Sequence, residues 1–221
     1  LELLLKGAAQ LGLTLTVDQM DRFRCYHKEL TAWNRKMNLT AITEWHEVQI
    51  KHFLDSLTTS LVLNNRLSYG CSLLDVGAGG GFPGGPFKIL YPEIRLSMLD
   101  SVAKKNTFLE HLISELGLDG VDIQTGRAED MALKPHLRES FDVVVSRGVA
   151  PMRILMELTL PFTVLGGLVA VLKKGEIEPE VGNSLHAMEV LGGKLQEIRS
   201  VAGVNGLEDN RVVVAVDKIR P

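Results

Sequence analysis

The stretch at residues 73–84, LLDVGAGGGFPG, constrains the fold more than any other part of the sequence. It begins as an apolar run typical of a buried strand and ends in a turn rich in glycine. Because glycine has no Cβ, such a turn lets backbone N–H groups approach a ligand at the start of the following helix. The stretch therefore predicts a strand, a ligand-binding turn and a helix in direct succession.

The spacing of the glycines fits two classes of ligand. Gly79, Gly81 and Gly84 match the G-x-G-x-x-G pattern of dinucleotide-binding loops, which hold a pyrophosphate. Asp75, two residues before Gly77, extends the pattern to D-x-G-x-G-x-G, which is typical of class I methyltransferases. A carboxylate there would repel a pyrophosphate and attract the ammonium and sulfonium groups of S-adenosyl-L-methionine. We expect S-adenosyl-L-methionine as the cofactor, with an NAD-dependent oxidoreductase as the alternative.

The composition of the 221-residue chain is that of a globular protein, with 45% apolar residues and a formal net charge of -3. No apolar run approaches the roughly 20 residues of a membrane-spanning helix, and the first residues, LELLLKGAAQ, resemble no signal peptide. Cys25 and Cys71 lack metal-ligand spacing and are expected to be reduced thiols. We expect a cytoplasmic monomer without a membrane partner or a metal, in which any nucleic acid is bound by a local basic patch.

Residues 1–66 read as helices throughout. Thr16 and Gln19 have the spacing of a capping box at a helix start, and apolar residues then recur at intervals of three and four. A second helix is expected after Thr43 and should end before Asn64. This segment predicts a helical appendage that precedes the remaining part of the chain.

From Ser72 onward the pattern alternates between strands and helices. Strands are expected at residues 72–76, 95–99, 121–125, 141–146, 167–172, 195–201 and 211–217. Helices are expected after Pro83, at residues 103–116, after Pro151 and at residues 178–191. Residues 67–221 are thus predicted to form an α/β, Rossmann-like class I methyltransferase fold, a mostly parallel seven-stranded sheet with helices on both faces. The ligand of such a fold lies at the carboxyl ends of the strands.

Three further segments follow strands at that edge. Asp100 ends the second strand, where nucleotide-binding folds place an acid that accepts ribose hydroxyls; an acid that merely begins the next helix is the alternative. Residues 126–130, GRAED, follow the third strand, where an adenine usually lies, although a charged surface turn has the same pattern. Arg147 follows the fourth strand and would donate to phosphate or a base edge, unless it pairs structurally with a carboxylate.

His52, Asp55 and Ser56 are spaced at i, i+3 and i+4, so one helix face presents all three. A metal site is disfavoured because no third and fourth ligand accompany them. Spacing alone favours a hydrogen-bonded His52–Asp55 pair that fixes the helix against the sheet.

Five segments agree in order and spacing with one family of proteins. They are WNRKMNLTAIT (33–43), IKHFLDSL (50–57), LLDVGAGGGFPG (73–84), GRAED (126–130) and SRGVAP (146–151). The chain closely resembles the RsmG family, also called GidB, which consists of bacterial methyltransferases. The resemblance implies methyl transfer from S-adenosyl-L-methionine to N7 of a guanine in 16S ribosomal RNA, with this RNA or the small ribosomal subunit as the partner.

The resemblance also implies a set of cofactor contacts. Carried over by position, these are Gly77, Phe82, Ala128, Glu129 and Arg147. The glycine pattern and the strand-end argument add Asp75, Gly79 and Asp100. Gly85 and Gly148 depart from the family pattern, which usually has an aliphatic residue and an alanine there.

The implied chemistry needs few special groups. Guanine N7 carries a lone pair and no proton, so no general base is expected and Arg147 would act by positioning. N7 lies in the deep major groove of A-form RNA, so the target guanine must be unpaired or splayed. The expected RNA contacts are Arg35, Lys36, Lys51, His52 and Lys173. A small-molecule methyltransferase and a non-catalytic RNA-binding module remain as alternatives.

Overall fold

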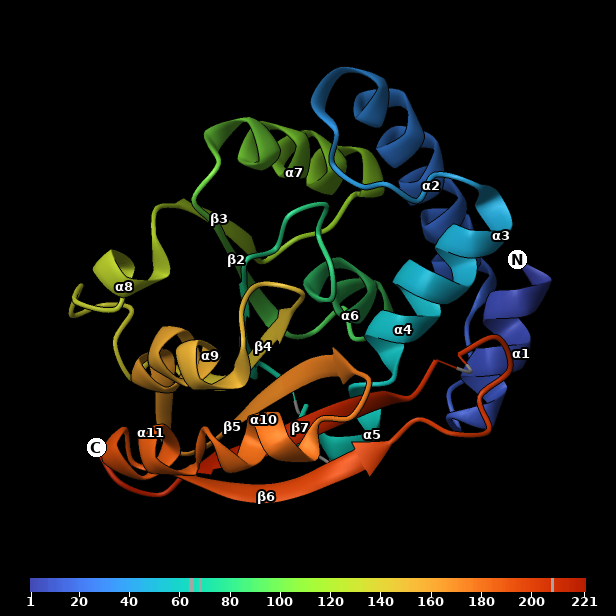
Figure 1. Ribbon diagram of the computed structural model, residues 1–221. Helices are drawn as coiled ribbons and strands as arrows, with labels where there is room; N and C mark the ends of the chain where they lie inside the picture. Colours follow the sequence, from blue (N-terminus) through green and yellow to red (C-terminus); the bar gives the residue numbers. More distant parts are fainter. Residues whose placement is uncertain (64–65, 68, 208) are drawn as a thin grey trace.

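A computed structural model shows a seven-stranded sheet with helices on both of its faces (Figure 1). It describes residues 1–63, 66–67, 69–207 and 209–221. The strands are β1 Ser72–Val76, β2 Arg95–Asp100, β3 Val121–Thr125, β4 Phe141–Arg147, β5 Thr163–Lys174, β6 Gly193–Ser200 and β7 Arg211–Lys218. The predicted class of fold is confirmed.

The strand order is β3-β2-β1-β4-β5-β7-β6. The first five strands in this order are parallel, whereas β7 runs antiparallel to both β5 and β6. The chain builds the sheet outward from β1 in one direction, and β4 then begins the other half on the opposite side of β1. The glycine-rich turn that follows β1 therefore lies where the strand order reverses, which is the usual place for a ligand in such sheets.

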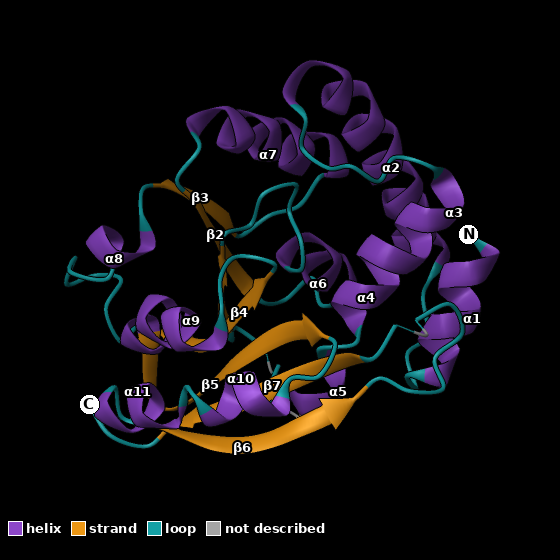
Figure 2. Cartoon of the chain, viewed as in Figure 1, coloured by secondary structure: helices purple, strands orange, loops and turns teal. Residues whose placement is uncertain are grey.

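The helices vary widely in length (Figure 2). Before the sheet they are α1 Glu2–Gln10, α2 Val17–Met37, α3 Trp45–Val48, the π-helical η1 Gln49–Leu54, α4 Asp55–Leu57 and α5 Ser60–Leu63. Between the strands they are α6 Gly84–Leu90, α7 Ala103–Leu116, α8 Ala128–Met131, α9 Met152–Thr159, the 3-10 helix η2 Leu160–Phe162, α10 Glu178–Gly182 and α11 Leu185–Val190.

Two apolar cores lie on opposite faces of the sheet because successive strand residues point to opposite sides. Leu73 of β1 joins a core with the helices α1, α2, α6 and α7, while the adjacent Leu74 joins a core with α8 to α11. Both faces are covered, which explains why β1 is buried over its whole length. Among the described residues, no helix is both long and apolar enough to cross a membrane.

The helices of the first third of the chain, residues 1–63, pack directly on the sheet. The side chains of Phe23, Tyr26 and Phe53 are fully buried in the same apolar cluster as Leu73 and Phe87. Residues 1–63 thus form part of one covering layer rather than a body joined only by a linker. The change at about residue 66 is a change of secondary-structure pattern within a continuous core.

Several local predictions are confirmed and others need correction. The capping box at Thr16 and Gln19 is present. The prediction of a single helix at 178–191 is wrong, because the chain forms two helices there, α10 and α11. Between them, the Ser184 hydroxyl donates a hydrogen bond of 2.7 Å to the Val181 carbonyl, which competes with regular helix geometry. The helix expected after Thr43 contains a π-helical turn, and its predicted end before Asn64 lies outside the described residues.

Candidate functional site

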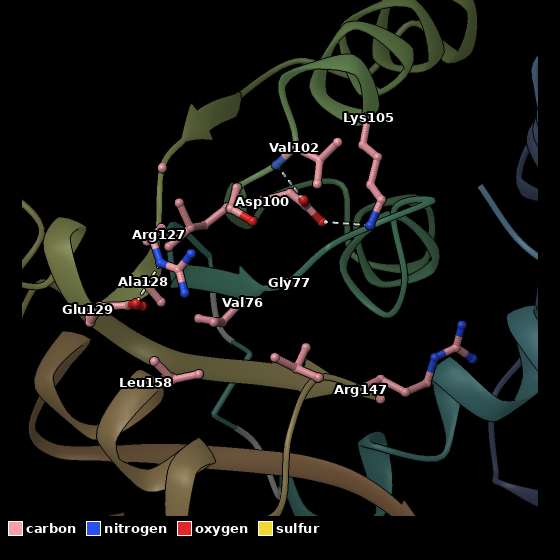
Figure 3. A pocket seen from close by; sticks show the side chains of 15 residues that line it. Val76, Gly77, Asp100, Val102, Lys105, Arg127, Ala128, Glu129, Arg147 and Leu158 are labelled. Atoms are coloured by element: carbon pink, nitrogen blue, oxygen red, sulfur yellow. Dashed lines mark hydrogen bonds and ion pairs between the residues drawn. The ribbon is translucent and has the colours of Figure 1, made fainter. Parts of the chain in front are cut away.

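An open cavity of about 390 Å³ lies at the carboxyl ends of β1, β2, β3 and β4 (Figure 3). It is lined by Val76, Gly77, Leu99, Asp100, Ser101, Val102, Lys105, Gly126, Arg127, Ala128, Glu129, Arg147, Gly148, Val149 and Leu158. The lining combines carboxylates and cations with apolar side chains. Such a mixture suits a ligand with a planar apolar part and several polar groups.

The glycine-rich turn owes its shape to backbone conformations that other residues rarely adopt. Gly77, Gly79 and Gly81 have φ values of +76°, +57° and +90°. A Cβ on Gly77 would collide with Cγ2 of Val149, another residue of the cavity lining. The positive φ and the contact with Val149 both require glycine at position 77 of the cavity lining.

Asp100 lies in the cavity wall, as predicted from its place at the end of β2. Its Oδ2 accepts a hydrogen bond of 2.9 Å from the Gly79 backbone N–H, and its Oδ1 accepts one of 2.9 Å from Val102. The Lys105 ammonium lies 3.6 Å from Oδ2. The carboxylate thus holds the glycine turn against the start of α7 and also faces the cavity.

The predicted cofactor contacts fall into two groups. Gly77, Asp100, Ala128, Glu129 and Arg147 line the cavity together. The remaining three, Asp75, Gly79 and Phe82, do not line it. Asp75 does not line the cavity because side chains alternate along β1. Val76 faces the cavity, so the adjacent Asp75 points to the other face of the sheet.

Asp75 lies beneath the glycine turn, fully buried. Its Oδ2 accepts a hydrogen bond of 2.7 Å from the Gly84 N–H at the start of α6. Burial raises the pKa of this carboxyl to about 7. From the sequence, we expected the Asp75 carboxylate to face the positive charges of the ligand. In this position it instead connects the glycine turn to α6 through the Gly84 N–H.

Phe82 forms part of an aromatic stack behind the cavity. Its ring stacks on Tyr26 with centroids 5.2 Å apart and on His52 with centroids 4.5 Å apart. The Tyr26 hydroxyl donates to the carbonyls of Gly80 and Gly81 at 2.7 and 2.9 Å. Sequence reasoning missed Tyr26, because no local pattern shows that a residue of α2 reaches the turn.

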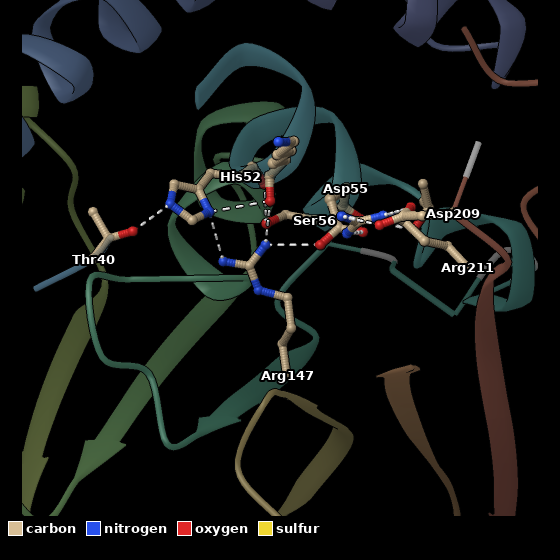
Figure 4. Close-up of polar contacts among 9 residues, drawn as sticks. Thr40, His52, Asp55, Ser56, Arg147, Asp209 and Arg211 are labelled. Atoms are coloured by element: carbon tan, nitrogen blue, oxygen red, sulfur yellow. Dashed lines mark hydrogen bonds and ion pairs between the residues drawn. The ribbon is translucent and has the colours of Figure 1, made fainter. Parts of the chain in front are cut away.

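Arg147 connects β4 to the helices of the first third (Figure 4). Its Nη1 donates to the Lys51 carbonyl at 3.0 Å and to Asp55 Oδ2 at 2.8 Å. Its Nη2 lies 3.1 Å from Nδ1 of His52, and its guanidinium carbon lies 5.1 Å from the centre of the Phe82 ring. The base of the side chain lines the cavity, while the charged end is engaged within the protein.

The His52–Asp55 hydrogen bond favoured from spacing is not found among the described residues, and that expectation is wrong. Arg147 lies between the two side chains and contacts both. The π-helical turn at Gln49–Leu54 changes the angular spacing on which the i, i+3 argument depended. Asp55 also pairs with Arg211 at 2.5 Å, a contact that the sequence did not indicate.

His52 is held in its neutral form. Burial and the neighbouring positive charge of Arg147 lower its pKa to about 4. The other ring nitrogen, Nε2, lies 2.8 Å from the Thr40 hydroxyl. With only 7% of its surface exposed, His52 is a buried structural contact and not the RNA contact that was expected.

The expected basic patch is only partly formed. Arg35 and Lys36 are exposed near the end of α2. Lys51 pairs with Glu47 at 2.5 Å. Lys173 donates to the Ala150 carbonyl at 2.8 Å and pairs with Glu180 at 2.6 Å, so its expected role in RNA contact is not supported by its position.

The departures at Gly85 and Gly148 have different physical reasons. A Cβ on Gly85 would lie 2.9 Å from the hydroxyl of Tyr26, which fills the space that an aliphatic residue would need. Gly148 has open space around it, but its φ of +67° favours glycine. Among the described residues, no group of three or more His, Cys, Asp or Glu side chains could hold a metal ion.

Comparison with known proteins agrees with this geometry. The model of the family described as rRNA small subunit methyltransferase G matches residues 19–209. A relative from Dehalococcoides mccartyi, named ribosomal RNA small subunit methyltransferase G, is 46% identical over 98% of this chain and 90% of its own length. A second relative of that name, from Thermoanaerobacter sp., is 44% identical over 90% of this chain and 82% of its own length.

Solved structures show the same architecture at low sequence identity. The precorrin-6y C5,15-methyltransferase of Geobacter metallireducens matches with a TM-score of 0.54 at 16% sequence identity. The matched region covers 76% of this chain and 88% of the chain of that structure. With the fold and the cavity at its switch point, the family match and these relatives place the chain among the class I, S-adenosylmethionine-dependent methyltransferases. Within that class, the chain belongs to the RsmG (GidB) family, rRNA small subunit methyltransferase G.

Proposed function

We propose that the protein transfers the methyl group of S-adenosyl-L-methionine to N7 of a guanine in 16S ribosomal RNA. The observation that carries this proposal is the cavity at the switch point of the sheet, in a chain that belongs to a family of small-subunit rRNA methyltransferases. The reaction takes place in the cytoplasm, on naked RNA or on the small ribosomal subunit, and the protein acts as a monomer.

The cavity fits S-adenosyl-L-methionine in shape and in chemistry. Gly77 contributes backbone without a side chain to the lining, and its positive φ favours glycine. Asp100 presents a carboxylate suited to ribose hydroxyls, and the segment Ala128–Glu129 lies beside it. The apolar side chains of Leu99 and Leu158 supply surface for an adenine. When bound, the cofactor supplies an electrophilic methyl group.

The protein would act mainly by positioning the two reactants. Guanine N7 carries no proton, so no residue has to remove one. Orienting bound reactants lowers a barrier by about 7 to 11 kcal/mol in favourable cases. Asp100 fixes the glycine turn, while Arg147 fixes β4 relative to the helices of the first third. Arg147 is therefore proposed as a positioning residue that also lines the cofactor cavity.

The test combines methyl transfer with mapping of the modified base. The protein is incubated with methyl-labelled S-adenosyl-L-methionine and either naked 16S RNA or small subunits that lack the modification. Borohydride reduction followed by aniline cleaves RNA at 7-methylguanosine, so one new cleavage site is expected. Label confined to a small molecule, or label in RNA without such cleavage, would contradict the proposal. Sedimentation of the purified protein tests its monomeric state.

A further inference from the structure

A second cavity lies between the carboxyl end of α2 and the first turns of α7, which pack side by side in Figure 1. Its volume is about 390 Å³. The lining residues are Ala32, Trp33, Lys36, Met37, Lys104 and Thr107. It therefore combines an aromatic ring and a thioether with two cationic side chains.

Trp33 is held in place by neighbouring rings. Its indole packs on Phe108 and on His111, with centroids 5.8 and 5.0 Å apart. His111 in turn contacts Glu29 at 2.8 Å. The half-buried indole thus has a fixed orientation before any ligand arrives, so little side-chain entropy is lost when a planar group stacks on it.

The cations at this cavity differ from their neighbours along the helices. Lys28 and Lys105 each lie within ion-pair distance of a carboxylate, Glu29 and Asp100 respectively. Lys36 and Lys104 are exposed and form no ion pair with any residue that the structure describes. Two uncompensated ammonium groups beside an aromatic ring complement a phosphate-linked base.

The second cavity is close to the cofactor cavity because one helix start borders both. Val102 and Lys105 line the cofactor cavity, whereas Lys104 and Thr107 line the second one. The beginning of α7 is the partition between them. A strand of RNA whose target guanine reaches the methyl group of a cofactor in the first cavity could therefore place a neighbouring nucleotide in the second cavity.

We propose that this second cavity binds an unpaired nucleotide of the substrate RNA that flanks the target guanine. The base packs on Trp33 and Met37, and its phosphates lie at Lys36 and Lys104. The proposal rests on the proposed function, since it names a further subsite for the same RNA substrate. Contacts to a neighbouring nucleotide would also explain how the enzyme selects one guanine among many, since this selection does not come from a general base.

The test measures binding of naked 16S RNA and steady-state methyl transfer in matched variants. Trp33→Leu should weaken RNA binding about fivefold or more, since one stacked base contributes about 1 to 3 kcal/mol. Trp33→Phe should restore most of that affinity because it restores an aromatic face. The double variant Lys36→Ala, Lys104→Ala should lower the slope of log affinity against log salt by about 0.7 for each lost phosphate contact. Affinity for S-adenosyl-L-methionine should not change.

Matched controls are Trp45→Leu on α3 and Lys194→Ala on β6, which lie outside the cavity and should bind RNA like the wild type. Wild-type affinity in a folded Trp33→Leu variant would overturn the proposal, as would a Trp33→Phe variant as weak as Trp33→Leu. Defects seen only with assembled subunits would overturn it in favour of a protein contact. If the wild type methylates no ribosomal RNA, the proposed function itself fails; normal methylation with unaffected variants removes only the subsite.

Discussion

Asp55 carries one buried carboxylate between two guanidinium groups. Arg147 approaches it at 2.8 Å and Arg211 at 2.5 Å, and all three side chains are largely buried. Asp55→Asn would leave the buried Arg147 guanidinium without an anion and Arg211 with Asp209 alone, so we expect the free energy of unfolding to fall by about 3 to 5 kcal/mol. Denaturant unfolding of the two proteins measures the difference.

The matched control is Asp209→Asn, because Asp209 also pairs with Arg211 but is half exposed. Exposed ion pairs contribute about 1 kcal/mol or less, so this variant should unfold close to the wild type. Equal effects of the two substitutions would contradict the view that Asp55 is the anion on which the cluster depends.

His52 should make the stability of the protein depend on pH. Its pKa is about 4 in the folded chain and 6.5 in the unfolded chain, so below pH 6.5 the unfolded chain binds a proton that the folded chain does not. Stability contributed by the neutral ring is therefore complete above about pH 6.5 and is lost as the pH falls toward about 4. The shift corresponds to a loss on the order of 3 kcal/mol.

The measurement is the unfolding free energy of the wild type and of His52→Gln from pH 7.5 to pH 4. Asp75 has a raised pKa and produces the opposite slope in the same range, so only the difference between the two proteins isolates His52. The difference in unfolding free energy between the two proteins should change from pH 7.5 to pH 4, because glutamine does not titrate. Parallel curves would show that the ring is not neutral in the fold.

Between elements, α2 is linked to the glycine turn through Tyr26. The Tyr26 hydroxyl donates to two carbonyls of the turn, and its ring stacks on Phe82. Tyr26→Phe would leave the buried Gly80 carbonyl without a donor, whereas the Gly81 carbonyl would keep the Gly85 N–H, at a cost of about 1 to 3 kcal/mol. We expect lower stability and weaker S-adenosyl-L-methionine binding in calorimetric titration, because the turn would no longer be held at its inner side.

Tyr91→Phe is the matched control. The Tyr91 ring also packs on a phenylalanine, Phe87, but its hydroxyl donates to no acceptor among the described residues. It should keep wild-type affinity for the cofactor. A Tyr26→Phe variant that binds the cofactor as tightly as Tyr91→Phe would show that the turn keeps its shape without α2.

The elements differ in how far the sequence could predict them. The boundaries of β1, β3 and α7 were predicted to the residue, because a glycine directly follows each of them, Gly77, Gly126 and Gly117 respectively. The π-helical turn and the break between α10 and α11 were not predicted. Side chains hydrogen-bond backbone carbonyls at both places, Arg147 to Lys51 within the π-helical turn and Ser184 to Val181 at the break, and the periodicity of apolar residues does not show such bonds.

The same division applies to the candidate site. Cavity residues at strand ends, such as Asp100 and Arg147, were predictable because parallel strands bring their carboxyl ends to one edge. The partners of those residues were not predictable. Tyr26 and Arg211 come from distant segments, and nothing in their local sequence shows what they contact in the folded chain.

At the scale of the whole molecule, the helices of the first third are part of the core on which the cofactor turn depends. Tyr26, Phe53 and Leu57 are fully buried in the apolar cluster that contains Leu73 of β1 and Phe87 of α6. The division into residues 1–66 and 67–221 therefore describes a difference in secondary structure, and we propose that the two parts do not fold separately.

A chain that begins at residue 67 tests this proposal. It would expose the sheet face that Phe53 and its neighbours cover, and it would remove Asp55 from the Arg147 cluster. An exposed apolar face of that kind favours aggregation, so we expect no cooperative thermal transition and increased binding of a hydrophobic dye. Adding residues 1–66 as a separate chain should restore some order if the core is shared. A truncated chain that melts cooperatively and binds S-adenosyl-L-methionine like the full protein would instead establish an independent domain.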